Sequence, residues 1–326
     1  LVGYGLSLLL GLQMTQPTEV FVVRDSMRLD LRTSVALDSK RVGTPKEKDS
    51  IILSATPIRL RGIRDEVLSF QLIVTGEPGP RLIRPYHFTD SSGGQLPVRM
   101  SFFEQRGIDI REESLNNRIR SLGEGFYPDA LIPTSTVVVR PKPKVTAVWV
   151  DVWIRPECPS GTFQGAFSVG AASNKIEIEL EVVDATMPKR SVAGLGAVNF
   201  GSVLERQNRV PDKFLHWMHL AQAHHFNIEF LRSRPRKDSN GFIEWELWAE
   251  KLDPLFTGAA FTSEYGYDGP RAGLPVTRFV LPHTDWWPAR ETDSKLPSDP
   301  KAWSLALKRW ERLAIRRGWF EQEYAT

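Results

Sequence analysis

The residues most able to do metal chemistry lie close together in the second half of the chain. His216, His219, His224 and His225 fall within ten positions. Histidine is a common metal ligand, but zinc-binding helices combine it with a carboxylate, as in HExxH. No carboxylate stands at that spacing here, and the step of five residues from His219 to His224 leaves the shared helix face. We therefore expect no metal site, and we expect no cofactor.

A second group of polar and aromatic side chains follows two short apolar runs. The run 193–203 places an asparagine near its end, and the run 280–282 leads directly into a polar and aromatic segment. Polar groups there suit hydrogen bonding to hydroxyls, and a tryptophan offers an apolar face to a sugar ring. The candidate substrate-binding residues are Asn199, His283, Asp285, Trp286 and Trp287. Packing of either tryptophan against a helix is the alternative.

The first half of the chain has the pattern of β strands. In KIEIELEVV (175–183), apolar residues alternate with lysine and glutamate. In AVWVDVWI (147–154) the second face carries Trp149, Asp151 and Trp153, so we expect both faces to be covered. LSFQLIV (68–74) alternates as well, and we expect Ser69 and Gln71 on its wet face. Short strands separated by Gly-, Pro- and Ser-rich turns are typical of an antiparallel sandwich.

The second half has a different pattern. Residues 211–227 and 298–318 show helical spacing, and Gly318 is a helix stop. The apolar runs 193–203 and 277–282 are strand-like. Strands alternating with helices indicate an α/β arrangement.

We therefore predict an all-β sandwich domain followed by an incomplete α/β (TIM-type) barrel. The sandwich covers 17–188, and the barrel begins at 189 and continues to 326. A closed (β/α)8 barrel typically needs about 200 residues or more. Residues 189–326 supply about half of one, so this region is predicted to be the first half of a barrel.

The opening residues 1–16 are apolar and carry no charge. Spanning a bilayer takes about 20 apolar residues. We therefore interpret the stretch as the remnant of a secretory signal peptide whose charged start is missing, which predicts a secreted or periplasmic protein without stable membrane insertion. A buried N-terminal segment is the alternative.

The amino-acid composition argues against a nucleic-acid-binding protein and against a disulfide-rich one. The 42 Lys and Arg against 39 Asp and Glu give a formal net charge of +3, which does not favour a nucleic-acid partner. With 41% hydrophobic and 25% charged residues, the chain is typical of a globular protein. The single cysteine, Cys158, excludes an internal disulfide framework and a CxxC site.

Several segments, taken in order, resemble one known family. They are GEGFYPDALIP (123–133), WVDVWIRP (149–156), PSGTFQG (159–165), VNFGSV (198–203) with LAQAHHFNIEFL (220–231), LDPLFTGAAF (252–261) and VLPHTDWWP (280–288). This order is similar to that of DUF4091 and glycoside hydrolase 123-like proteins. The resemblance implies an N-terminal β-sandwich before a (β/α)8 barrel and a carbohydrate substrate or ligand. The family usually has Glu or Asn before Trp-Pro, whereas this chain has Asp285-Trp286-Trp287-Pro288.

The resemblance also implies an activity. Active members cleave N-acetyl-hexosaminide linkages with an adjacent Asp-Glu pair, in which the Glu is the general acid and the Asp orients the substrate's acetamido group. The chain has one Asp-Glu dipeptide, Asp65-Glu66, which we interpret as a solvated turn. By order, the catalytic pair is expected beyond Thr326, so the catalytic residues are unknown. The alternative is a non-catalytic carbohydrate-binding or surface-interaction protein, because a fold does not fix a function.

Overall fold

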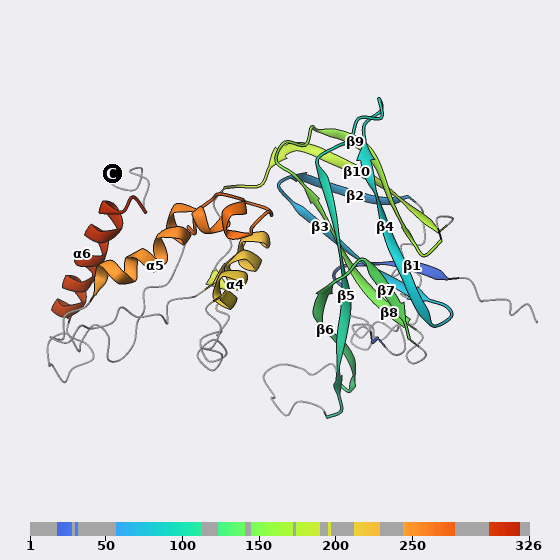
Figure 1. The fold of residues 1–326 in the computed structure, drawn as a ribbon, viewed down its shortest axis with the longest axis horizontal. Helices are drawn as coiled ribbons and strands as arrows, with labels where there is room; N and C mark the ends of the chain where they lie inside the picture. Colours follow the sequence, from blue (N-terminus) through green and yellow to red (C-terminus); the bar gives the residue numbers. More distant parts are fainter. Residues whose placement is uncertain are drawn as a thin grey trace, which may run out of the picture. The chain divides into compact units, whose positions relative to one another are not determined.

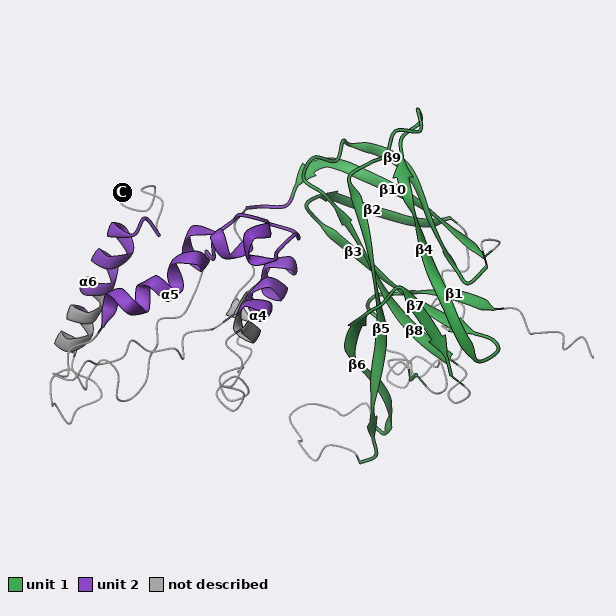
Figure 2. Cartoon of the chain, viewed as in Figure 1, with its two compact units in different colours: residues 1–186 green, residues 187–326 purple. Residues whose placement is uncertain are grey.

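The chain divides into two compact units, residues Leu1–Thr186 and Met187–Thr326 (Figure 2). The computed structural model describes residues 18–27, 30–31, 57–112, 123–140, 145–171, 174–189, 195–196, 212–228, 244–277 and 300–319. The two units are described separately below.

The first unit is built from strands, which form two five-stranded sheets (Figure 1). The strands are β1 (Glu19–Arg24), β2 (Ile58–Arg64), β3 (Val67–Thr75), β4 (Gly79–Thr89), β5 (Val98–Ile110), β6 (Gly125–Pro133), β7 (Thr136–Val139), β8 (Val145–Ile154), β9 (Gly161–Val169) and β10 (Lys175–Thr186). One sheet has the order β1-β3-β8-β5-β6 and the other β2-β10-β9-β4-β7. Neighbouring strands pair antiparallel except β2 and β10, which are parallel.

One hydrophobic core joins the inner faces of the two sheets. Phe70 of β3 and Phe102 of β5 both pack on Phe167 of β9, with ring centroids 6.1 and 5.7 Å apart. On β10 the predicted alternation is confirmed, because Ile178 and Leu180 are fully buried while Glu177 is exposed. Burial of apolar surface contributes about 25 cal/mol per Å², so this core is the main source of stability in the first unit.

Strand β3 differs from its prediction. Its polar residue Gln71 is only 2% exposed, because a second cluster that includes Ile73 covers that face too. Gln71 Nε2 donates to the carbonyl oxygens of Arg24 (2.8 Å) and Met27 (2.7 Å). Its Oε1 accepts from Gln105 Nε2 at 2.8 Å. A buried amide is tolerated because these partners satisfy it.

The dipeptide Asp65-Glu66 is not the solvated turn that we predicted. It joins β2 to β3 and thereby connects the two sheets. Asp65 is 6% exposed with a positive φ of 63°, and Trp153 Nε1 donates to its Oδ1 at 3.2 Å. Glu66 Oε2 accepts from the backbone N–H of Ile63 at 2.9 Å. Both carboxylates therefore accept hydrogen bonds that stabilise the turn between β2 and β3.

The second unit consists mainly of helices in the described residues. Its elements are β11 (Leu195–Gly196), α4 (Asp212–Ala223), β12 (Asn227–Ile228), α5 (Trp245–Thr257), the 3-10 helices η2 (Ala259–Phe261) and η3 (Ser263–Tyr265), and α6 (Pro300–Arg316). The helices predicted within 211–227 and 298–318 are confirmed as α4 and α6. A separate core of buried side chains from α4, α5, α6 and the loop after α5 holds the unit together.

The predicted fold class, a sandwich followed by an incomplete TIM-type barrel, is wrong. The described residues lie mostly in the two sheets of the first unit, with three helices in the second and no α/β barrel. Parallel pairing there is limited to two residue pairs, between β11 and β12. The segment 245–257, which we had not assigned to a helix, forms α5, and it packs with α6 in a helical core. In the second unit, helix packing thus replaces the expected layer of parallel strands in the described ranges.

A loop, residues 262–276, is fastened to the helices of the second unit. Gln222 Nε2 on α4 donates to the carbonyl oxygens of Arg271 (2.9 Å) and Leu274 (2.8 Å). At the end of α5, Gly258 has a φ of 84°, and a Cβ there would lie 2.2 Å from the carbonyl oxygen of Gly273. The glycine of LDPLFTGAAF is therefore required for the close approach of this loop.

We expect Phe167→Ala to lower the free energy of unfolding of the first unit by about 3–5 kcal/mol, because it opens a cavity in a fully buried part of the core. Urea unfolding followed by circular dichroism measures the change. Leu82→Ala is the control, since Leu82 is 43% exposed and should change stability by no more than about 0.5 kcal/mol. Equal losses for the two variants would contradict the assignment of the core.

Gly258→Ala and Gly266→Ala separate backbone strain from steric clash. Both glycines have positive φ, but a Cβ on Gly266 would meet nothing within 4 Å. The cost for Gly266→Ala should therefore be conformational only, about 1–2 kcal/mol. Gly258→Ala should cost at least about 1 kcal/mol more, because the 273 backbone must move. Thermal unfolding measures both, and a smaller loss for Gly258→Ala would contradict the close approach.

Candidate functional site

The five predicted substrate-binding residues lie outside the described residues. They are Asn199, His283, Asp285, Trp286 and Trp287. The predicted signal-peptide remnant, residues 1–16, also lies outside them. Carbohydrate contact by those five side chains stays a prediction from the sequence.

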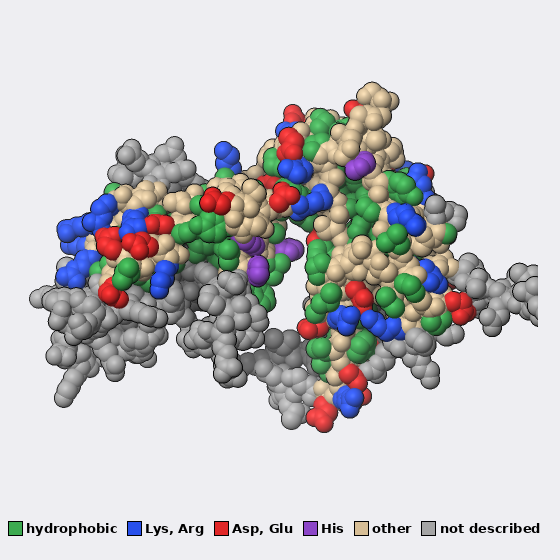
Figure 3. Space-filling view, in the orientation of Figure 1, with side chains coloured by type: hydrophobic (Ala, Val, Ile, Leu, Met, Phe, Trp, Pro, Cys, Tyr) green, Lys and Arg blue, Asp and Glu red, His purple; other side chains and the backbone are tan. Residues whose placement is uncertain are grey.

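The histidines of α4 gather on one part of the second unit (Figure 3). His219 Nε2 lies 2.7 Å from the carbonyl oxygen of Ala260, and its ring centroid is 4.9 Å from that of Tyr267. Burial lowers the pKa of His219; the Ala260 hydrogen bond opposes this shift, and the neighbouring His216 adds to it. Within the described ranges no three His, Cys, Asp or Glu side chains come together as a metal would require. In the structure, His219 is a packing residue.

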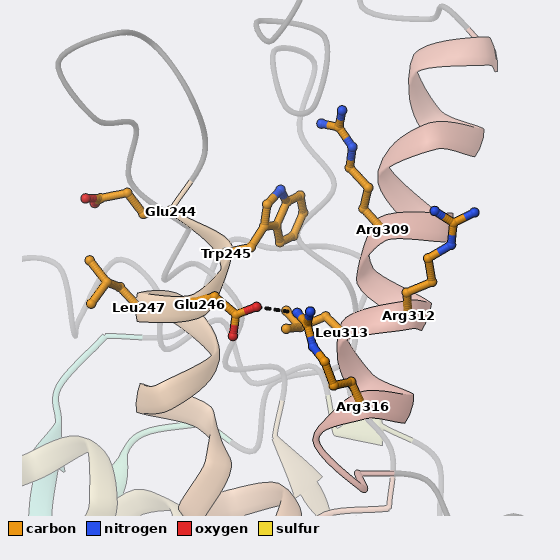
Figure 4. Close-up of a pocket in the computed structure, with 8 residues that line it drawn as sticks. All are labelled: Glu244, Trp245, Glu246, Leu247, Arg309, Arg312, Leu313 and Arg316. Carbon is orange, nitrogen blue, oxygen red and sulfur yellow. Dashed lines mark hydrogen bonds and ion pairs between the residues drawn. The ribbon is translucent and has the colours of Figure 1, made fainter.

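A cleft lies between α5 and α6 of the second unit (Figure 4). Its volume is about 550 Å³. It is lined by Glu244, Trp245, Glu246, Leu247, Arg309, Arg312, Leu313 and Arg316. Sequence reasoning missed this cleft because it did not assign α5 to a helix, although the apolar spacing of that helix was a signal.

The helical repeat of α6 places the arginines of the cleft. Arg309, Arg312 and Arg316 follow one another at i, i+3 and i+7, which share one side of a helix. Leu313, only 2% exposed, belongs to the core and anchors this side of α6 against α5. In Figure 4 the three arginine side chains project from α6, and Trp245 lies at the start of α5 facing them.

Ion pairs at the end of α6 fix its position on α5. Glu246 accepts from Arg316 and from Arg317 Nη2, the latter at 2.6 Å. Asp253 pairs with Arg317 and accepts from Trp319 Nε1 at 2.7 Å. The hydrogen bond from Arg317 is the main reason that the pKa of Glu246 is lowered.

The cleft has an excess of positive charge. Its lining contains three arginines and two glutamates. Glu246 is already paired with Arg316 and Arg317, and Glu244 points away from α6 (Figure 4). Basic and acidic side chains lie side by side over this end of the unit in Figure 3. The arrangement suits an anionic group, since guanidinium groups bind oxyanions with paired N–H donors.

We expect the second unit to lose stability as the pH falls from about 7.5 to about 5.5. The pKa of His219 is lowered from its usual 6.5 by burial, so the unfolded chain takes up a proton first. The contribution of neutral His219 to the free energy of unfolding is fully present above pH 6.5. It is lost as the pH falls toward the lower pKa of His219 in the folded state. Thermal unfolding across this range should show a shallower pH slope for His219→Gln. His224→Gln, at an exposed position, should keep the original slope; an unchanged slope for His219→Gln would contradict the prediction.

No protein-family model and no curated protein matches the chain. Among solved structures, the chain is similar to a family 123 glycoside hydrolase from Clostridium perfringens studied for glycolipid glycan hydrolysis, with 11% identity and a TM-score of 0.47. That match covers 72% of this chain and 45% of the hydrolase, so the chain spans less than half of its length. AvmM, which catalyses macrocyclization in alchivemycin A biosynthesis, matches with 10% identity and a TM-score of 0.21 over 41% of this chain and 88% of its own. No helix in the described ranges has the length and apolar character to cross a bilayer.

Proposed function

We propose that the chain is a glycoside hydrolase-like protein that acts on N-acetyl-hexosaminide-type glycans. The observation that carries the proposal is the order of its motifs, which runs from GEGFYPDALIP (123–133) to VLPHTDWWP (280–288) and resembles glycoside hydrolase 123-like proteins. The proposed ligand is a carbohydrate, in keeping with the hydroxyl-binding and aromatic residues that follow strand-like runs.

The places of the N-terminal motifs support the proposal. GEGFYPDALIP includes β6, WVDVWIRP includes the end of β8, and PSGTFQG leads into β9. Trp149 Nε1 and Ser69 Oγ both donate to Asp151 Oδ1 at 2.7 Å. Tyr127 donates its hydroxyl to the carbonyl oxygen of Gly123 at 2.7 Å. The polar residues of these motifs therefore take part in hydrogen bonds within the first unit.

The proposed sugar contacts come from the segment after residue 282. Consecutive side chains of an extended segment point to opposite sides. On such a segment Trp286 and Trp287 would point to opposite sides, and we propose that one of them faces the sugar. Asp285 and His283 would then hydrogen-bond hydroxyls, with Asn199 contributing from the run 193–203.

A non-catalytic carbohydrate-binding protein is the second candidate, and one observation favours it. The only Asp-Glu dipeptide of the chain is engaged in the turn between β2 and β3, where Asp65 accepts from Trp153 and Glu66 from the backbone of Ile63. These two carboxylates are therefore not free for acid catalysis. Assays with aryl N-acetyl-hexosaminides separate the candidates, because turnover favours the hydrolase and binding without turnover favours the binding protein.

Trp286→Ala and Trp287→Ala should differ in their effects on binding. Stacking of a sugar on an aromatic face is worth about 1 kcal/mol, so one variant should bind N-acetyl-hexosamine oligosaccharides about fivefold more weakly by titration calorimetry. The other should mainly lower the melting temperature.

Trp319→Ala is the matched control for loss of an indole. Trp319 is 7% exposed and stacks on Phe256 at 4.6 Å. The variant should be less stable but keep its sugar affinity at a temperature where it is folded. Unchanged affinity in both the Trp286 and Trp287 variants would refute the aromatic contact, and the lack of any binding by the unaltered chain would refute the proposed function.

A further inference from the structure

We propose that the cleft between α5 and α6 binds a sulfate or phosphate group carried by an organic ligand. None of the residues that line it is one of the predicted sugar contacts, and the proposal does not depend on the proposed function. The charge, shape and lining of the cleft each point to such a ligand.

The charge of α6 is the first observation. Its sequence has five Lys and Arg against one acidic residue, Glu311. Arg309 and Arg312 are separated by three positions, and Arg312 and Arg316 by four, so like charges are neighbours on the helix surface. Such pairs destabilise a helix by about 0.2–0.5 kcal/mol each. A bound anion would relieve this repulsion.

The pairing of the arginines is the second observation. Arg316 is held by Glu246, which also accepts from Arg317. Arg312 is exposed, and it makes no ion pair in the part of the chain that the structure describes. Arg312 lines the cleft together with Arg309 and the fixed Arg316, and all three side chains project from α6 in Figure 4. Planar guanidinium groups bind sulfate and phosphate through two parallel N–H donors.

The size and the apolar lining of the cleft indicate that the anion is part of a larger molecule. A volume of about 550 Å³ falls in the range of small-molecule sites and exceeds the need of a bare ion. Trp245 and Leu313 supply apolar surface beside the arginines. An organic ring or chain attached to the anion would cover it.

Titration calorimetry at low salt with three probes tests the proposal. The probes are sodium sulfate, N-acetylglucosamine 6-sulfate and unsulfated N-acetylglucosamine. We expect the sulfated sugar to bind most tightly, and its affinity to fall as sodium chloride is added because the ions screen the charges. Equal affinity for sulfate alone would overturn the organic part of the proposal, and lack of binding by both sulfated probes would overturn the whole.

Variants of α6 identify the site. Arg312→Ala should weaken binding of N-acetylglucosamine 6-sulfate at least tenfold without lowering the melting temperature, because its side chain is exposed. Lys308→Ala removes another exposed charge of α6 that does not line the cleft, and it should leave the affinity within about twofold. Arg312→Lys should restore only part of it, since lysine keeps the charge but lacks the paired donors. Equal losses for Arg312→Ala and Lys308→Ala would mean a non-specific charge effect and would overturn the site.

The two proposals fail in different ways. Loss of neutral-sugar binding in the tryptophan variants concerns only the segment after residue 282. Loss of sulfate-dependent affinity in Arg312→Ala concerns only the cleft. The unsulfated sugar therefore serves as the internal reference in both experiments.

Discussion

Burial of the apolar inner faces of two sheets against each other is the constraint on which the first unit depends. Phe167 of β9 meets Phe70 of β3 and Phe102 of β5, so one ring touches two strands of the opposite sheet. The strands must keep their registers for these rings to meet, because a shift by one residue would turn every side chain to the other face. The turn at Asp65 must also keep its conformation, because it connects β2 of one sheet to β3 of the other.

The second unit buries its apolar side chains between helices rather than between sheets. Core residues of α4, α5 and α6 pack together, and Arg317 ties α6 to α5 through Glu246 and Asp253. Exposed ion pairs contribute little, typically about 0–1 kcal/mol. Arg317 is only 20% exposed and Asp253 31%, so this pair acts with the buried Trp319 to fix the angle of α6. That angle creates the cleft, because it sets the arginine side of α6 opposite the start of α5.

The sequence predicted those elements that bury one face and expose the other, and it missed those whose burial depends on contacts with several distant residues. Strand β10 has one wet and one dry face, and its alternation was sufficient. Gln71 was misplaced because a polar residue can be buried when Arg24, Met27 and Gln105 satisfy it, which local sequence does not show. Helix α5 contains Pro254, and a proline normally ends a helix. With α5 missed, the cleft could not be predicted, and the strand-like runs before and after this helix in the sequence suggested a barrel instead.

The two proposals concern different parts of a ligand: one concerns neutral sugar hydroxyls and the other a charged sulfate or phosphate group. Sugar hydroxyls are neutral, so contacts such as those proposed for Trp286 and Asp285 discriminate by shape and hydrogen bonding. A sulfate or phosphate substituent carries charge, which hydroxyl-binding residues cannot select strongly. Under the second proposal, the arginines that line the cleft on α6 would supply that selection. A chain with both features would distinguish a charged glycan from its neutral parent through the cleft, because electrostatic complementarity contributes to specificity more than to raw affinity.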